Sequence, residues 1–319
     1  MRTKTKKVVA IFILIAVTVG CFLGMLVKQR IDKEVTIPYS MYKIHEQLSE
    51  PENIIKWFLP FAGMDSSTQK IKTTVKRIET GESYLEVTNQ SIAGSGIVTG
   101  NKNGKKFLLF SIIPDSINTI QCDVQLSYNT TLFKKLFGGN SLEKDAVKSL
   151  ENLKAYMEDT KKLYGFEIGR ETVIDTSFLF SRRTVPQNDK QVGTKNIFED
   201  LIAYAEKNNL GYTGTRIFYT MTHSGDQVTL YASIGISKRF ENTVGNVYEY
   251  KAMPAGKNLL VAIYQGPYGE VNKAYSALEQ YKSDYLLSSM AIPFQKFMNE
   301  GYDFADDQVV QLKVYYPIF

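Results

Sequence analysis

Apolar and polar residues alternate along many short stretches of this sequence, and each such stretch predicts a β-strand. In the first half, a strand at residues 33–39 precedes a helical stretch that is broken near Pro51. The strand candidates that follow are residues 69–78, 83–92, 94–101, 105–113 and 118–128. A long helical pattern then begins at the cap candidate Ser141 and ends at Gly165. The first half therefore predicts a strand, two helices, a run of antiparallel strands and one long helix.

The second half repeats one order of elements. The first copy contains a strand, a helix, a further segment and a closing strand at residues 173–182, 195–210, 216–223 and 226–237. The second copy has them at residues 258–265, 269–287, 294–302 and 307–318. Phe198, Leu201 and Tyr204 in the first helix have the same spacing as Tyr275, Leu278 and Tyr281 in the second, and Asp-Gln-Val opens both closing strands. Repeated order with matching helix register predicts a duplicated β-α-β-β unit. The fold class expected for the whole chain is α+β.

The first half resembles the START-like or polyketide-cyclase superfamily (SRPBCC) over residues 31–165. The resemblance lies in the order of elements and in an opening that carries Pro38, Pro51 and Trp57. It implies a helix-grip domain, in which a curved sheet wraps a C-terminal helix around an apolar cavity, with Trp57 as a candidate ligand contact.

The second half resembles the gyrase-inhibitor-like (GyrI-like) effector-binding domain of some AraC- and MerR-type regulators over residues 168–319. The residues that carry this resemblance are Gly266, Pro267 and Tyr268, the terminal run Tyr315 to Ile318, and the run Met253 to Gly256. It implies a ligand cleft between the two repeats, with Tyr264 and Tyr268 near the ligand.

The corner Gln-Gly-Pro-Tyr at residues 265–268 also has a physical interpretation. Gly266 tolerates backbone angles that are closed to other residues. Pro267 fixes its own φ and has no N–H, so sheet pairing cannot continue through it. The chain is expected to leave the sheet there and to enter a helix.

Residues 8–27 form a twenty-residue stretch without a charged side chain. Such a helix is about 30 Å long, enough to cross a bilayer core. Four basic residues precede it, so the positive-inside rule predicts a cytoplasmic tail, a single-pass anchor in the cell membrane and extracytoplasmic domains. Cleavage as a signal peptide or lipoprotein at Cys21 is the alternative, although Thr18 and the apolar residues after Cys21 favour an uncleaved anchor.

The net charge of +5 comes from the first thirty residues, which hold six basic side chains and no acidic one. The rest of the chain has 32 basic and 33 acidic side chains. A nucleic-acid partner is disfavoured because such proteins present a basic face on their folded part.

The sequence predicts no catalytic residue, no metal site and no cofactor. His45 and His223 fall in different halves without metal-ligand or nucleophile-base spacing. The resemblance of the second half implies a buried carboxylate from the closing strands in drug-sensing members and a glutamate in hydrolytic members, whereas this chain has Gln311 and Lys313 near Pro317. The sequence does not place Glu249 or Glu270 in the cleft.

Tyrosines are the stronger indication of a binding site, because each has an apolar ring with a polar tip. The candidate ligand-binding residues are Tyr219, Tyr231, Tyr264, Tyr268, Tyr315 and Trp57. Packing within the sheet is the alternative role for each tyrosine. The expected function is a membrane-anchored protein that binds a hydrophobic or amphipathic small molecule. An enzyme of the hydrolase or cyclase type, and a partner-docking protein with filled pockets, are the alternatives.

Overall fold

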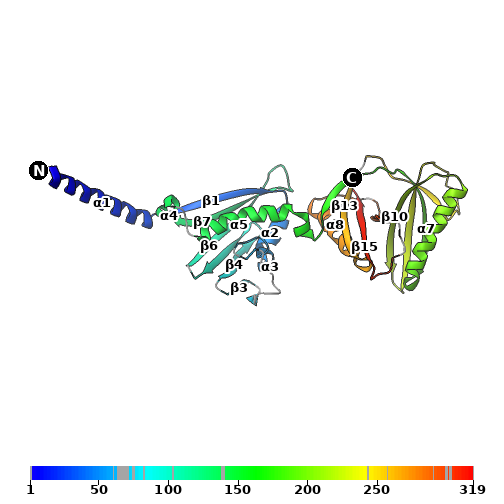
Figure 1. Cartoon of the computed structure of the whole chain (residues 1–319), viewed down its shortest axis with the longest axis horizontal. Helices are drawn as coiled ribbons and strands as arrows, with labels where there is room; N and C mark the ends of the chain where they lie inside the picture. Colours follow the sequence, from blue (N-terminus) through cyan, green and yellow to red (C-terminus); the bar gives the residue numbers. More distant parts are fainter. Residues whose placement is uncertain are drawn as a thin grey trace. The chain divides into compact units, whose positions relative to one another are not determined.

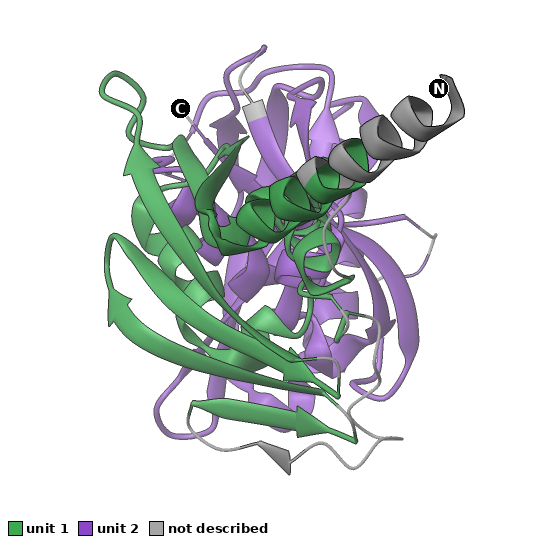
Figure 2. Cartoon of the chain, turned by 90° about the vertical axis from the view of Figure 1, so that its left-hand side faces the viewer, with its two compact units in different colours: residues 1–158 green, residues 159–319 purple. Residues whose placement is uncertain are grey.

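The computed structural model describes residues 2–59, 61–62, 72–73, 76–81, 83–102, 104–137, 141–242, 244–256, 258–289, 291–298, 301 and 304–318. Within these ranges the side chains of residues 2–12, 16, 72–73, 137 and 258 lie outside the description. The chain is a mixed α+β protein with two antiparallel sheets. It divides into two compact units, unit 1 (residues 1–158) and unit 2 (residues 159–319), coloured separately in Figure 2.

Unit 1 contains a seven-stranded sheet in the order β1-β7-β6-β5-β4-β3-β2. Its helices are α1 (Arg2–Leu26), α2 (Met41–Ser49), α3 (Pro51–Ile54), α4 (Leu132–Phe137) and α5 (Ser141–Glu158). Its strands are β1 (Lys28–Ile37), β2 (Lys72–Thr73), β3 (Arg77–Thr80), β4 (Ser83–Ser91), β5 (Gly94–Asn101), β6 (Gly104–Pro114) and β7 (Cys122–Thr131). This is the predicted order, with a short extra helix, α4, that the sequence did not indicate.

The core of unit 1 lies between the sheet and its helices. Helix α5 packs on β1, β6 and β7, as Figure 1 shows, and buries Leu142, Ala146, Leu150 and Leu153. Trp57 is fully buried and makes an edge contact with the ring of Phe110, 5.7 Å between ring centroids. Residues 69–71 and 74–75 of the predicted strand at 69–78 lie outside the described residues. The described part forms two strands, β2 and β3, that pair antiparallel, so the prediction of one continuous strand was wrong.

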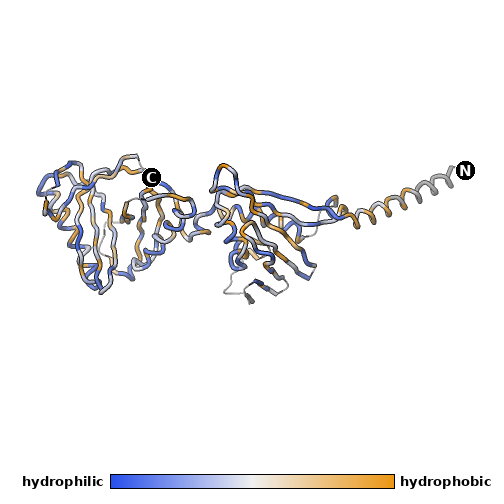
Figure 3. The backbone as a smooth tube through the Cα atoms, turned by 180° about the vertical axis from the view of Figure 1, so that it is seen from behind, coloured by the Kyte–Doolittle hydropathy of each residue, from blue (hydrophilic) through white to orange (hydrophobic). Residues whose placement is uncertain are grey.

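Helix α1 is the first element of unit 1. Among the described residues, no helix is long and apolar enough to cross a bilayer. Within the predicted span at residues 8–27, the side chains of residues 8–12 and 16 lie outside the description. The predicted anchor is without support from the structure. Figure 3 colours the described turns of α1 mostly as hydrophobic. Their large apolar side chains that are more than half exposed are Ile13, Leu14, Ile15, Val17, Val19, Phe22, Leu23, Met25 and Leu26.

Unit 2 contains an eight-stranded antiparallel sheet in the order β12-β9-β11-β10-β14-β15-β13-β8. Its helices are α6 (Thr160–Tyr164), α7 (Lys190–Lys207), α8 (Asn272–Asp284) and the 3-10 turns η1 (Gln187–Asp189) and η2 (Tyr268–Glu270). Its strands are β8 (Ile168–Thr172), β9 (Ser177–Pro186), β10 (Tyr212–His223), β11 (Gln227–Ile236), β12 (Glu249–Ala252), β13 (Asn258–Pro267), β14 (Phe294–Phe297) and β15 (Val309–Pro317).

The predicted duplication is visible in the strand order of this sheet. The first repeat is β9-α7-β10-β11 and the second is β13-α8-β14-β15. In the sheet, β9, β11 and β10 are followed by β14, β15 and β13, so the second repeat presents the same strands in reverse order. The two repeats are thus related by a pseudo-twofold axis between β10 and β14.

Helix α6 belongs to unit 2, although the sequence placed its residues in the first domain. Asp159 caps α6 by accepting a hydrogen bond from the Lys162 backbone N–H. The ring of Tyr164 packs edge-on against Tyr281 of α8, and its hydroxyl donates to Asp284 at 2.8 Å. Gly165 then ends α6 with a φ of 83°, a backbone angle that favours glycine.

The corner after β13 has the predicted strand-to-helix geometry, but the role of its glycine differs. Strand β13 ends at Pro267, and η2 and α8 follow at once. Gly266 is not among the residues with positive φ. A Cβ at Gly266 would lie 2.8 Å from the hydroxyl oxygen of Tyr264, which donates a 2.5 Å hydrogen bond to the Pro267 carbonyl. The glycine therefore makes room for a tyrosine that closes the corner.

Candidate functional site

A cavity of unit 2, called the aromatic cavity below, has a volume of about 580 Å³. It spans the four strands of the first repeat's half of the sheet and the segment that leads into β14. Its lining residues are Phe180, Arg182, Ile217, Phe218, Tyr219, Tyr231, Ser233, Glu249, Lys251, Met253, Ala291, Ile292, Pro293 and Phe294. The described lining thus joins β9, β10, β11 and β12 to β14.

Side chains along β9 and β11 alternate between the two faces of the sheet, and the cavity and helix α7 lie on opposite faces. Leu230 and Val185 face α7, because a Cβ on Gly193 of α7 would lie 3.0 Å and 3.3 Å from them. Tyr231 and Phe180 are offset by odd numbers of positions from these residues, so they point to the opposite face. The aromatic cavity is therefore on the face of the sheet that α7 does not cover.

Aromatic rings form one wall of the cavity. Phe180 and Tyr231 are stacked, with ring centroids 6.4 Å apart. Tyr219 and Tyr231 are cross-strand partners with centroids 6.0 Å apart. On the other side, Phe294 is stacked on Tyr315 at 5.1 Å. Apolar rings with a few polar tips are the lining typical of sites for small organic molecules.

Charged side chains lie on β12 and β9 beside these rings. The Lys251 amino group is 2.6 Å from a Glu249 carboxylate oxygen and 5.3 Å from the centroid of the Phe180 ring. Arg182 is paired across the sheet with Tyr231 and is exposed. Within the described lining, Glu249 is the one carboxylate and its charge is balanced by Lys251. This arrangement can hold a polar ligand group, but it lacks a pair of carboxylates for acid-base chemistry.

A smaller cavity of about 160 Å³ continues from the aromatic cavity. The two share Ile217, Ser233, Lys251, Met253, Ala291 and Ile292. The smaller one reaches Val173 and Leu259, which belong to a buried apolar cluster with Val261, Phe294 and Tyr315. That cluster covers the face of the second repeat, so the open space lies over the first repeat.

Two of the predicted site residues, Tyr219 and Tyr231, line the aromatic cavity together. Phe180 and Phe294 also line the cavity, but they were not predicted as site residues from the sequence. Phe180 was identifiable as a position of an alternating strand, but its partner across the sheet was not. Glu249, which the sequence left unplaced, also lines the cavity.

Tyr264 and Tyr268 lie outside the described lining. Both are nearly fully buried. The Tyr268 hydroxyl accepts a 2.6 Å hydrogen bond from the Gln295 amide, and burial raises the pKa of this hydroxyl. Both tyrosines are therefore packed within the second repeat and do not face the aromatic cavity.

Tyr315 and Trp57 also lie outside the described linings. The Tyr315 hydroxyl donates to Glu171 at 2.8 Å, and burial together with this carboxylate raises the pKa of Tyr315. Trp57 belongs to the core of unit 1, where its indole N–H donates to the Gln47 carbonyl at 3.4 Å. His45 and His223 are in different units, and the His223 Nε2 lies 2.8 Å from the Thr229 hydroxyl oxygen.

No protein-family model matches this sequence, and a comparison with curated proteins gives no match. Solved structures match at low similarity. The EcmrR–DNA complex is 13% identical with a TM-score of 0.39, covering 58% of this chain and 74% of that chain. A putative transcription regulation protein from Staphylococcus aureus MU50 is 13% identical with a TM-score of 0.29, covering 48% and 99%. SAV2435 bound to tetraphenylphosphonium is 11% identical with a TM-score of 0.30, covering 48% and 94%. At these values the function must be argued from the chain's own geometry.

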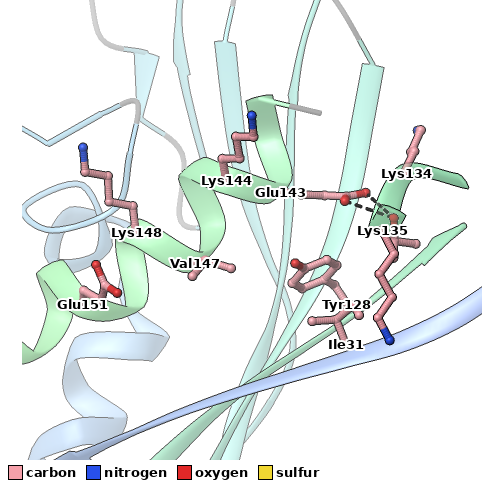
Figure 4. A pocket seen from close by; sticks show the side chains of 10 residues that line it. Ile31, Tyr128, Lys134, Lys135, Glu143, Lys144, Val147, Lys148 and Glu151 are labelled. Atoms are coloured by element: carbon pink, nitrogen blue, oxygen red, sulfur yellow. Dashed lines mark hydrogen bonds between the residues drawn. The ribbon is translucent and has the colours of Figure 1, made fainter. Parts of the chain in front are cut away.

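Unit 1 has a separate groove of about 390 Å³, the lysine groove, between α4, α5 and the edge strands (Figure 4). Its lining residues are Ile31, Tyr128, Thr130, Lys134, Lys135, Glu143, Lys144, Val147, Lys148 and Glu151. Figure 4 shows Lys144 and Lys148 extending from α5 and Lys135 extending from α4 toward β1. Among the described residues, none of the four lysines is in an ion pair.

The buried acid of this groove is already neutralised. Glu143 is 4% exposed, lies 2.6 Å from the Lys106 amino group and accepts 3.0 Å hydrogen bonds from the Thr130 hydroxyl. Lys106 is outside the lining, so the groove keeps an excess of positive charge over an apolar floor of Ile31, Tyr128 and Val147. An anionic group is the ligand type that this charge would favour.

Proposed function

We propose that unit 2 binds an apolar or amphipathic small molecule in the aromatic cavity. The observation that carries the proposal is an open cavity of about 580 Å³ with stacked rings along one wall. This volume falls within the range typical of small-molecule sites, about 300–1,000 Å³. An open aromatic cavity distinguishes a binding protein from a docking protein with filled pockets. The lack of paired carboxylates in the described lining disfavours hydrolysis.

Mass spectrometry of the purified full chain in a non-ionic detergent tests this function. A co-purified organic molecule should be released on denaturation, and its amount should fall in a Tyr231→Ala variant. Tyr42→Ala is the matched control, because Tyr42 is 72% exposed in unit 1. A wild-type protein that is free of ligand, and that shows no thermal shift with any member of a panel of aromatic compounds, would reject the proposal.

We also propose that unit 2 is a GyrI-like effector-binding domain over residues 168–319 and that unit 1 is a START-like domain over residues 31–165. The duplicated strand order of unit 2 and the Gly266-Pro267-Tyr268 corner support the first assignment. The sheet and the long helix α5 support the second. Experimental coordinates of either unit with a different strand order would reject the corresponding assignment.

A third part of the proposal is that residues 8–27 hold the chain in the cell membrane, with the N-terminus in the cytoplasm and the rest outside. The uncharged sequence of this stretch supports it.

Fractionation of cells that express the full chain tests the membrane part. The protein should remain in the membrane pellet after alkaline carbonate washing, and protease added outside the cytoplasmic membrane should degrade both units. Release by carbonate, or protection of both units from that protease, would reject this arrangement. Neither result bears on ligand binding by unit 2.

A further inference from the structure

The cavity face of the unit 2 sheet carries more basic than acidic side chains, and this imbalance indicates the charge of the ligand. The strand registers place the charged side chains of this face at Arg182, Lys251, Lys296, Lys313, Glu171 and Glu249. Four of these side chains are basic and two are acidic.

Both carboxylates are already bound to lysines. Glu249 is 2.6 Å from Lys251, and Glu171 is 2.5 Å from Lys313. Burial alone would raise the pKa of Glu171, but hydrogen bonds from Lys313 and the Tyr315 hydroxyl leave that pKa below its ordinary value. Glu171 therefore stays ionised and paired at neutral pH.

Arg182 is left over, because it is in no ion pair with another residue of the described part of the chain. Lys296 is not left over, since its charge also lowers the pKa of Glu171. Lys296 lies across the sheet from Ile217, a lining residue, and Arg182 lines the cavity itself. Among the charged side chains that the strand registers place on this face, Arg182 is therefore the cation that no carboxylate balances. A cationic ligand would be repelled there, and an anionic one attracted.

Arg182 is also placed next to the aromatic wall. It is the cross-strand partner of Tyr231, whose ring stacks on Phe180. A guanidinium binds a carboxylate or sulfonate through two parallel hydrogen bonds, and this geometry also fixes the orientation of the ligand. A flat molecule against the rings would have its acidic group within the reach of this side chain.

We propose that the ligand of the aromatic cavity is an aromatic acid whose ring packs on Phe180, Tyr219 and Tyr231 and whose carboxylate or sulfonate binds Arg182. The proposal rests on the binding function given above. It explains why a lysine, Lys313, is tolerated in the closing strand: its charge is balanced by Glu171, so Arg182 is left to select the anion.

Three probes with one ring system test it: 1-naphthoate, 1-naphthylmethanol and 1-naphthylmethylammonium. Their binding to the full chain in a non-ionic detergent is measured by isothermal titration calorimetry. The acid should bind at least about tenfold more tightly than the ammonium compound, since hydrogen bonds to a charged group contribute about 1.5–3 kcal/mol. Higher salt should reduce this preference.

Arg182→Gln and Arg183→Gln are the matched variants, because they remove the same charge from adjacent positions on opposite faces of β9. Arg183 faces α7, where it binds Asp200 at 2.8 Å. R182Q should weaken 1-naphthoate about tenfold and leave 1-naphthylmethanol unchanged, whereas R183Q should leave both unchanged.

A preference for the ammonium compound or the alcohol, or equal losses in the two variants, would reject the acidic ligand while leaving the binding function intact. If none of the three probes binds, and the ligand screen described above is also empty, both proposals fail.

Discussion

The buried tyrosines of unit 2 hold structural hydrogen bonds with particular partners. Tyr264 binds the Pro267 carbonyl, Tyr268 binds Gln295, and Tyr315 binds Glu171. Tyr219 and Tyr231 instead line the aromatic cavity. Tyr315 shares the cavity face with Tyr219 and Tyr231 but belongs to the second repeat, where that face is filled. A tyrosine's role thus depends on both the face and the repeat that it occupies, and sequence spacing alone gives neither.

Tyr268→Phe should destabilise unit 2 by about 1–3 kcal/mol, because the Gln295 amide, which is 3% exposed, would lose its acceptor in the core. The free energy of unfolding from denaturant titration measures this. Tyr42→Phe, at an exposed position, should change it by less than about 0.5 kcal/mol. Equal effects of the two variants would show that the Gln295 contact is not stabilising.

Glu171→Gln should have a pH-dependent effect. The pKa of Glu171 is lower in the folded chain than its ordinary value. The ionised carboxylate therefore stabilises the fold above the unfolded pKa, and this contribution is lost as the pH falls through the folded pKa. The stability difference between wild type and E171Q should be constant near neutral pH and should shrink below about pH 4. Denaturant titrations of both proteins between neutral and acidic pH measure it, and a difference that grows toward acid would contradict the assignment.

At the scale of elements, the strands and helices of both repeats were predictable because their hydrophobic periods are clear. The edge strands β8 and β12 and the helix α4 were not, since each has six residues or fewer and depends on tertiary contacts. The structure adds a further sign of duplication: both repeats end their first strand with a proline, Pro186 or Pro267, followed by a 3-10 turn and a helix. Helix α7 has 18 residues and α8 has 13. Because of this difference in length, Pro186 and Pro267 do not align when the two helices are matched in the sequence.

Leu201→Ala and Leu278→Ala should have similar costs, because the two leucines occupy equivalent positions and both are fully buried. Each variant should lose about 2–5 kcal/mol of unfolding free energy. Val192→Ala in α7 is the control, since Val192 is 60% exposed, and it should lose less than about 0.5 kcal/mol. A large cost at only one of the two leucines would mean that the helices do not anchor their repeats equivalently.

At the scale of the whole molecule, the cavity of unit 2 could be expected from the duplication, but its position could not. The sequence placed the ligand at the Tyr264–Tyr268 corner. The structure instead fills the face of the second repeat with Val173, Leu259 and Val261 and leaves the cavity over the first repeat. Val173 comes from the segment between β8 and β9, and no periodic pattern predicts where such a segment packs.

Because the chain has two compact units, a ligand of the aromatic cavity should stabilise only one of them. At about 100 times its dissociation constant, 1-naphthoate should add about 2.7 kcal/mol to the unfolding free energy of unit 2 and none to that of unit 1. Differential scanning calorimetry of the full chain measures this as a shift of one transition. A shift of the unit 1 transition, or of neither, would contradict ligand binding in unit 2.

The most direct test of the account is a crystal structure of the chain grown with 1-naphthoate. We predict the naphthalene ring in van der Waals contact with Phe180 and Tyr231 and the carboxylate within hydrogen-bonding distance of Arg182. A cavity filled by its own side chains, or a ligand bound anywhere other than this face of the sheet, would contradict it.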